Sequence, residues 1–247
     1  MSGRIVGIIP ARYASSRFPG KALADLCGKP MIQHVVERAS RARLLHEVLV
    51  ATDDRRILES VQAFGGKGCM TSPDHPSGTD RIAQVARDLA CDLVVNIQGD
   101  EPLIDPQVID RAVEPLVADD RVVMGTLGRP MGVEEAADPG KVKVVLDRQG
   151  FALYFSRASI PYLRDGMPPG SDRPYLLHMG LYVYRRDTLL RLAALSPTPL
   201  EERERLEQLR ALEHGIRIRV VVTDHESFGV DTPADLERVK QIMSERF

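Results

Sequence analysis

The chain lacks several features that would assign a protein to a class at once. It contains no apolar run of about 18 residues, which excludes a hydrophobic membrane-spanning helix. Its N-terminus has neither the apolar core nor the small-residue cleavage site of a signal peptide. The formal net charge of −2 over 247 residues gives no reason to expect nucleic acid or an anionic membrane surface as a partner. We therefore expect a soluble globular protein.

Cysteine is scarce. The three cysteines, Cys27, Cys69 and Cys91, are odd in number and too widely spaced for a zinc ribbon or a redox pair. We expect reduced thiols that pack in the interior of a cytoplasmic protein. A reactive role for Cys27 is left open.

Standard nucleotide-binding fingerprints are also absent. The P-loop requires Ser or Thr directly after its lysine, whereas Lys21 is followed by Ala22, and no Gly-x-Gly-x-x-Gly occurs. No Ser/His/Asp or Cys/His constellation for nucleophilic catalysis can be recognised either. Any nucleotide site must therefore be built in another way.

A basic loop is the most informative feature that is present. An apolar strand at residues 5–9 leads into a loop rich in Pro, Ser and Gly that carries Arg12, Arg17 and Lys21, and no carboxylate occurs before Asp25. Backbone N–H groups and the N-terminus of the following helix would add positive potential, so the loop predicts a triphosphate site. The alternative is a solvated basic loop whose cations pair with acids elsewhere in the fold.

The first 115 residues alternate strands with helices, which predicts a mainly parallel sheet flanked by helices. Ligands on such sheets bind beyond the carboxyl ends of the strands, so the basic loop and Asp100 could face one crevice. The expected strands are residues 5–9, 48–52, 69–70 and 93–97, and the expected helices are residues 31–39, 56–63 and one capped within Ser77–Asp80.

From Val122 onward the pattern changes. A hairpin is expected at residues 142–155, followed by a strand at 179–184, helices at 187–195 and 200–214, a strand at 216–222 and a final helix from Thr232. We therefore expect an α/β core made of residues 1–121 and 200–247. Residues 122–199 would form a smaller mixed sub-domain with a dimer surface.

Two acidic positions are candidates for a magnesium site. Asp100 and Glu101 follow a buried strand, and Gly99 allows close approach of the backbone. Mg²⁺ is commonly held by one or two carboxylates and the phosphates of a substrate. A turn acid bonded to its own backbone is the alternative. Asp231 precedes a helix start that does not need it as a cap, and a structural role for it is equally compatible with the spacing. We interpret Asp53 and Asp54 as an acid pair at a helix start.

Taken together, these segments resemble the 3-deoxy-manno-octulosonate (Kdo) cytidylyltransferase family over essentially the whole chain. The resemblance implies a nucleotide-diphospho-sugar-transferase type of α/β fold, a homodimer, and the Mg²⁺-dependent reaction CTP + Kdo → CMP-Kdo + diphosphate, for lipopolysaccharide synthesis. The segments that carry it are residues 9–21, 28–32, 51–54, 77–81, 96–102, 154–157, 206–210 and 229–233.

The resemblance also implies roles for particular residues. Arg12 and Lys21 would bind the triphosphate, and Asp100 and Asp231 would hold Mg²⁺; these four form the expected catalytic set. Gln98 and the segment from Ser77 to Asp80 would lie near the cytosine or the ribose. The sugar-acid pocket would be lined by Arg157, His178, Tyr182, Glu207 and Gln208.

Residue types alone give the sugar-acid group other interpretations. Arg157 could cap a strand end, Glu207 and Gln208 could belong to a solvated helix face, and His178 and Tyr182 could be packing residues. Rival activities are a cytidylyltransferase for 8-amino-Kdo or for sialic acid, and an inactive nucleotide-binding protein. The segment Phe18–Lys21 argues against the sialate enzyme, because the basic loop of that family is spaced differently.

Overall fold

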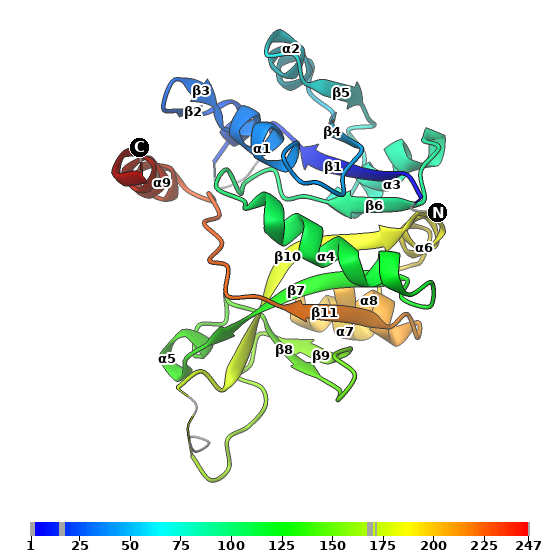
Figure 1. Ribbon diagram of the computed structural model, residues 1–247, viewed down its shortest axis with the longest axis vertical. Coiled ribbons are helices and arrows are strands. Elements are labelled where there is room, and N and C mark those ends of the chain that lie inside the picture. Colours follow the sequence, from blue (N-terminus) through cyan, green and yellow to red (C-terminus); the bar gives the residue numbers. More distant parts are fainter. Residues whose placement is uncertain (1–2, 15–17, 167–169, 171, 247) are drawn as a thin grey trace. The chain divides into compact units, whose positions relative to one another are not determined.

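The computed structural model describes residues 3–14, 18–166, 170 and 172–246. The chain divides into two compact units, one made of Met1–Asp110 with Ser227–Phe247 and the other of Arg111–Glu226. Figure 1 shows their elements along the chain. Arg17 lies outside the described residues, so its expected phosphate contact stays a prediction.

The first unit contains the expected parallel strands, β1 (Ile5–Ala11), β4 (Glu47–Thr52), β5 (Lys67–Met70) and β6 (Leu93–Asn96). They are ordered β6-β1-β4-β5 and every pair is parallel. Ile8 lies opposite Asn96 and Ala11 opposite Thr52, so these strands end at one edge of the sheet. That edge is where the sequence places the basic loop and Asp100.

Helices of the first unit begin where the capping residues predict. Asp54 accepts from the N–H of Arg56 to cap α2 (Arg55–Ala63), and Ser77 accepts from the N–H of Asp80 to cap α3 (Gly78–Asp88). The remaining elements are η1 (Lys21–Leu23, a 3-10 helix), the hairpin β2 (Asp25–Leu26) and β3 (Lys29–Pro30), α1 (Met31–Ala39) and α9 (Pro233–Arg246).

The second unit is mixed, as expected. β7 (Met124–Met131) pairs antiparallel with β10 (Tyr175–Arg185) and parallel with β11 (Ile218–Val222). The expected hairpin is confirmed as β8 (Lys143–Leu146) and β9 (Ala152–Ser156), and β8 also pairs with β10. An irregularity in β10 between Met179 and Tyr182 shifts its register against β7.

The prediction of one helix over residues 200–214 is wrong. The structure has α7 (Pro199–Glu204) and α8 (Gln208–Glu213), separated at Arg205, whose φ of 54° is left-handed. Charged residues hide this break in the sequence, because glycine usually marks such a position. The other helices are α5 (Val133–Ala136) and α6 (Arg186–Ala193).

The two units are bounded differently from the sequence-based division. Residues 111–121 and 200–226 lie in the second unit, whereas the sequence analysis assigned them to the first. The physical reason is strand pairing and packing: β11 pairs with β7, and α8 packs against β9. The helix α4 (Pro106–Ala118) runs across the first boundary.

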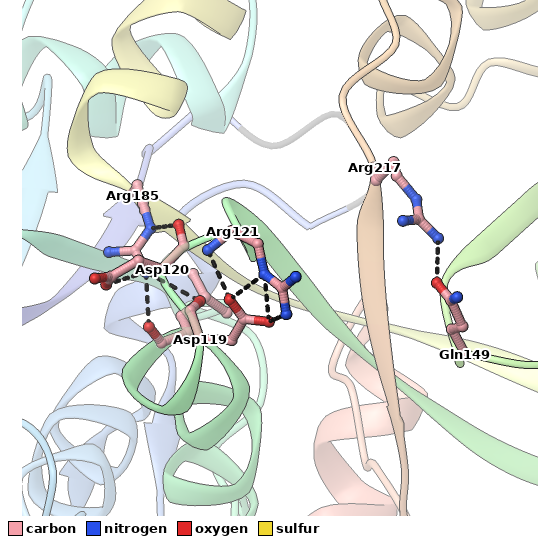
Figure 2. Close-up of polar contacts among 7 residues, drawn as sticks. Asp119, Asp120, Arg121, Gln149, Arg185 and Arg217 are labelled. Atoms are coloured by element: carbon pink, nitrogen blue, oxygen red, sulfur yellow. Dashed lines mark hydrogen bonds and ion pairs between the residues drawn. The ribbon is translucent and has the colours of Figure 1, made fainter.

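Arg185 stabilises the C-terminal end of α4. Its guanidinium donates to the carbonyl oxygens of Leu116, Asp119, Asp120 and Val122, at 2.9 to 3.2 Å. Figure 2 shows this arginine beside Asp119 and Asp120. The last carbonyl groups of a helix have no hydrogen-bond donors within the helix, so the guanidinium acts as the donor.

All three cysteines are free thiols, but Cys27 is exposed at the tip of the β2–β3 hairpin, contrary to the expected packing role. Its φ of 53° and the φ of 83° at Gly28 fit a tight two-residue turn, which turns the side chain outward. None of the helices in the described part of the chain has the length and apolarity needed to span a bilayer.

Candidate active site

The basic loop is folded by its own backbone. The N–H of Gly20 donates to the carbonyl of Tyr13 at 2.9 Å, and Gly20 adopts a left-handed φ of 71°. A side chain at position 20 would be strained there and would crowd the Tyr13 ring. This turn starts η1 and sets the position of Lys21.

Lys21, Asp100 and Asp231 meet in the first unit, although they are far apart in sequence. The ammonium of Lys21 lies 2.7 Å from Oδ2 of Asp100 and 3.3 Å from Oδ1 of Asp231, and it donates to the Val230 carbonyl at 3.0 Å. The N–H of Val230 in turn donates to the Asp100 carbonyl at 2.8 Å. Lys21 therefore has counter-charges that the sequence near the loop does not supply.

Two local features shape the backbone beside Asp100 and Asp231. A Cβ at position 99 would lie 3.0 Å from the Pro10 carbonyl, which confirms that Gly99 allows close approach between the loops after β6 and β1. At the start of α9, Thr232 and Asp235 bond each other reciprocally, with Asp235 Oδ2 accepting from the Thr232 N–H at 2.8 Å. The Asp231 carboxylate is therefore not used as the cap.

A cleft of about 290 Å³ opens at this edge of the sheet. Arg12, Lys21, Ser77, Gln98, Asp100 and Asp231 all line it, so six of the seven residues expected in the nucleotide half come together. The seventh, Asp80, is absent from the lining; its carboxylate accepts from the Ser77 hydroxyl at 2.6 Å. Asp80 thus orients Ser77 at the start of α3.

A helix N-terminus does face the cleft, but not the expected one. The element after the basic loop is the three-residue η1, which is too short to carry a helix dipole. Instead Ser77 and Gly78, at the start of the 11-residue α3, contribute to the lining. The partial positive charge of that helix end favours an anion in the cleft.

Among the ionisable residues of the lining, sequence reasoning overlooked two, His75 and Arg81. The Arg81 guanidinium is buried and donates to Asp53 at 2.7 Å and to the Thr71 hydroxyl. Asp53 is therefore an ion-pair partner rather than a second capping acid, while Asp54 caps α2 as expected. His75 lies 2.5 Å from the Gln84 side chain. Only the segment Ser77–Arg81, quoted for the resemblance, hinted at Arg81.

Charges in the cleft differ in exposure. The Lys21 side chain is 17% exposed, Asp100 31% and Asp231 47%, while Arg12 is exposed and pairs with no carboxylate among the described residues. Beside Asp100, burial raises the pKa of Glu101 to about 7, although its hydrogen bond from Ser227 opposes the shift. The cleft thus combines accessible cations with two accessible acids.

The donor set fits Mg²⁺ bound together with a nucleotide. The described residues contain no group of three or more His, Cys, Asp or Glu able to hold a metal by themselves. Mg²⁺ usually takes one or two protein carboxylates and completes its shell with water and substrate phosphates. Asp100 and Asp231 both lie within salt-bridge distance of the Lys21 ammonium, so the two carboxylates face a common position.

In the second unit, His178 and Tyr182 form part of an aromatic group. The His178 ring lies 4.9 Å from Phe155 and 5.3 Å from Tyr182, and Tyr182 stacks on Tyr184 at 5.9 Å. Desolvation lowers the pKa of His178 to about 3, so the ring is neutral at pH 7. The contacts among these side chains are therefore made by neutral aromatic rings and not by ion pairs.

Hydrogen bonding favours one tautomer of His178. Its Nε2 lies 3.1 Å from the buried hydroxyl of Thr126, which also lies 3.0 Å from the Met179 carbonyl and 2.8 Å from the Leu181 carbonyl. Carbonyls only accept, so when the single hydroxyl proton of Thr126 goes to one of them, His178 donates to Thr126 from Nε2 and Nδ1 is an acceptor.

Glu207 and Gln208 lie at the start of α8. Desolvation raises the pKa of Tyr182 well above 10, and the nearby Tyr184 and Glu207 charges add to the shift. Gln208 is buried within α8. Of the five expected sugar-acid residues, His178 and Tyr182 are therefore in ring contact, and the Glu207 charge acts on Tyr182.

The side chain of Arg157 is committed to backbone groups. Its guanidinium donates to the carbonyls of Glu204 at 2.8 Å, Pro139 at 3.0 Å and Arg205 at 3.4 Å. The alternative considered from sequence, a strand-end cap, describes this arrangement better than a free guanidinium awaiting a carboxylate. The partners are main-chain carbonyls, however, and not an acidic side chain.

The cleft lies beyond the ends of parallel strands and combines loop cations with two acids, which is the arrangement expected of a nucleotidyltransferase. Comparison with known proteins supports this class of enzyme. A family model described as Cytidylyltransferase matches residues 6–218. A putative glucose-1-phosphate thymidylyltransferase from Bacillus anthracis shares the fold at a TM-score of 0.68 and 17% identity, over 96% of this chain and 94% of that one.

Relatives with higher sequence identity identify the family within this class of enzymes. 3-Deoxy-manno-octulosonate cytidylyltransferase of Geobacter metallireducens is 55% identical over 98% of both chains, and that of Geobacter sulfurreducens is 57% identical over 95% of this chain and 97% of the other. A solved CMP:2-keto-3-deoxy-manno-octonic acid synthetase, complexed with CTP, has a TM-score of 0.94 and 46% identity, covering 99% of this chain and all of the other. The chain belongs to the 3-deoxy-manno-octulosonate cytidylyltransferase family.

Proposed function

We propose that this protein activates Kdo by the reaction CTP + Kdo → CMP-Kdo + diphosphate. The observation that carries the proposal is the convergence of Lys21, Asp100 and Asp231 in a cleft that Arg12 also lines. Relatives of the same family, with more than half of their residues identical, bear the name of this activity. The product would serve lipopolysaccharide synthesis.

The chemistry joins two anions, so the site must neutralise charge. The anomeric hydroxyl of Kdo attacks the α-phosphorus of CTP, a new O–P bond forms, and the bond from the α-phosphorus to the α–β bridging oxygen breaks. The hydroxyl proton goes to solvent and diphosphate leaves. Arg12, Lys21 and the N-terminus of α3 would stabilise the negative charge that the leaving group gains.

Asp100 and Asp231 would hold Mg²⁺ when it is bound with the nucleotide. The ion would act as a Lewis acid toward phosphate oxygens and lower the pKa of a hydroxyl that it binds. Ser77, oriented by Asp80, and Gln98 would contact the cytosine or the ribose. No protein nucleophile is needed in this scheme.

The sugar acid would be recognised by residues of the second unit. His178 offers the acceptor Nδ1, and Tyr182 and Glu207 offer a hydroxyl and a carboxylate suited to the hydroxyl groups of Kdo. Gln208 would support this group from inside α8. Neutral His178 avoids an unpaired charge in a desolvated place.

We also propose a homodimer built through the second unit, in the cytoplasm. Leu153 and Tyr162 of that unit are 62% and 86% exposed, which is unusual for large apolar side chains and suits a contact with a second copy. Free thiols, including the exposed Cys27, suit a reducing compartment. Light scattering of the purified protein would test the dimer; a monomeric mass at working concentration would contradict it.

Release of diphosphate tests the reaction. The protein is incubated with CTP, Mg²⁺ and one of Kdo, 8-amino-Kdo or sialic acid, with omission of the sugar as the control. We expect the highest kcat/KM with Kdo. Preference for sialic acid or 8-amino-Kdo would overturn the substrate, and no release with any sugar would favour an inactive nucleotide-binding protein.

A further inference from the structure

Lys143 is a buried cation without an acidic partner among the described residues. Its side chain is fully buried, and its ammonium donates to the carbonyls of Asp138 at 3.1 Å, Lys141 at 2.6 Å and Arg157 at 2.5 Å. An ammonium has three hydrogens, so these carbonyls use its whole donor capacity. Such a buried lysine is costly, and its bonds join three separate points of the backbone.

Arg157 continues this network to the end of α7. Its guanidinium donates to the carbonyls of Pro139, Glu204 and Arg205. The Glu204 carboxylate in turn accepts from the N–H of Arg157 at 2.9 Å and from the Ser156 hydroxyl at 2.6 Å. The end of β9 and the end of α7 are therefore tied together by both the backbone and the side chain of Arg157.

The network ends at a backbone conformation that the sequence disfavours. Arg205 has a φ of 54° and a ψ of 48°, in the left-handed region that favours glycine. The residues around it, 201–210, have the composition of a continuous helix. The N–H groups of Arg205 and Leu206 donate locally to the Glu201 carbonyl, and from outside the segment the Arg157 guanidinium binds the carbonyls of Glu204 and Arg205, directly at the break.

The break determines the direction in which α8 starts. Glu207 and Gln208 follow it at the start of α8, which packs against β9, and Phe155 of β9 contacts the His178 ring at 4.9 Å. The Glu207 charge also contributes to the raised pKa of Tyr182. On the other side of the network, Lys143 lies opposite Leu177 in the β8–β10 pairing, and the His178 N–H donates to the Val142 carbonyl at 2.8 Å. The network thus joins the strand that carries His178 to the segment that carries Glu207.

We infer that Lys143 and Arg157 are positioning residues for Kdo: they hold the α7–α8 break and thereby keep Glu207 in place beside Tyr182 and His178. This inference rests on the proposed function, because it assigns these residues to the sugar-acid half of that site. It replaces direct contact between Arg157 and the Kdo carboxylate by an indirect role.

Steady-state kinetics of Lys143→Met and Arg157→Gln, with CTP and Kdo varied separately, test the inference. We expect the KM for Kdo to rise roughly 10- to 100-fold, because misplacement by about 1 Å has effects of that size. The KM for CTP should change less than about twofold, since the nucleotide residues lie in the first unit. An equal rise in both KM values, or no change in either, would overturn the inference.

Arg185→Met is the matched control. Arg185 also binds backbone carbonyls at the end of a helix in the same unit, but within the described part of the chain its guanidinium donates to the segment 116–122 alone. A loss of stability comparable to that of Arg157→Gln is expected without selective loss of Kdo binding. If Arg185→Met raised the KM for Kdo equally, general destabilisation would explain the effect and the inference would fail.

A second variant separates positioning from direct contact. Glycine adopts the left-handed conformation without strain, so Arg205→Gly alone should be close to the wild type. Added to Arg157→Gln, it should recover at least part of the loss in the KM for Kdo. No recovery would indicate that the Arg157 guanidinium contacts the sugar acid itself, which contradicts the inferred role.

Hydrogen exchange without substrate keeps this test distinct from the test of the proposed function. Amides 206–210 should exchange faster in Lys143→Met and Arg157→Gln than in the wild type, and at the wild-type rate in Arg185→Met. An inactive wild type would overturn the proposed function but leave this comparison meaningful. Unchanged exchange would overturn the inference even if the enzyme makes CMP-Kdo.

Discussion

The two groups of proposed substrate-binding residues, one in each unit, rest on different physics. In the first unit, Lys21, Asp100 and Asp231 are charged and partly exposed, and Lys21 lies within salt-bridge distance of both acids. In the second unit, His178 and Tyr182 are desolvated, and their surroundings hold both in neutral forms. One half is therefore suited to neutralising phosphate, and the other to shaping a pocket for a polyhydroxylated acid.

This difference explains why the halves depend on distant residues in different ways. The field of a charge acts over several ångströms, so Lys21 and Arg12 would attract a triphosphate before any direct contact forms. Contacts with the hydroxyl groups of a sugar require placement within a few tenths of an ångström. The second unit accordingly uses a buried lysine and an arginine to hold its backbone.

The largest expected effect tests the charged half. Asp100→Asn keeps the shape but removes one of the two carboxylates, and kcat/KM should fall roughly 10²- to 10³-fold, with unchanged circular dichroism. Binding of Mn²⁺ in the presence of CTP, followed by electron paramagnetic resonance, should weaken in parallel. Asp25→Asn, at an exposed acid of the same unit, is the control. Near-normal turnover would remove Asp100 from the site.

Arg12→Ala sharpens the comparison within the charged half. Arg12 is exposed and lines the cleft, so its loss should raise the KM for CTP roughly 10-fold while the KM for Kdo stays within about twofold. This pattern is the reverse of that expected for Arg157→Gln. Unchanged kinetics with CTP would show that the loop is not the phosphate cradle.

The neutral state of His178 in the second unit should affect how the unfolding free energy depends on pH. The pKa of His178 is about 3 in the folded protein against an ordinary 6.5, so the unfolded chain takes up the proton first as pH falls. The contribution of neutral His178 to the unfolding free energy is complete above pH 6.5 and decreases below that value. Between pH 7.5 and 5 the wild type should lose about 2 kcal/mol of unfolding free energy relative to His178→Gln. Parallel pH profiles would show that His178 titrates normally.

The smallest expected effect concerns the helix start beside Asp231. Thr232→Ala removes the reciprocal cap with Asp235 and should lower the unfolding free energy by about 1 kcal/mol, measured by urea denaturation. Turnover should change only slightly, because the Asp231 carboxylate takes no part in the cap. A loss of activity as large as that of Asp100→Asn would mean that the cap also places Asp231.

Local sequence signals were sufficient for much of the first unit. The apolar runs of β1 and β6, the caps Asp54 and Ser77, and the need for glycine at position 99 act over a few residues. These signals can therefore be recognised from the sequence without knowledge of the fold. Parallel strand order then places the basic loop and Asp100 at the same edge.

Other features depend on partners far away in the chain. The composition of residues 201–210 favours one helix, yet Arg205 interrupts it, and the carbonyls at this break accept hydrogen bonds from the Arg157 guanidinium, 47 and 48 residues away. The unit boundaries differ from the expected ones for a similar reason, since β11 joins β7 by strand pairing. Neither partner can be identified from spacing.

The sequence by itself determined the parallel α/β class, the basic loop and the two acids, because hydrophobic periodicity and charge are local properties. The tertiary structure decided that Lys21 lies between Asp100 and Asp231, that Arg157 binds main-chain carbonyls and that His178 is neutral. These outcomes depend on distance and desolvation, which exist only once the chain has folded.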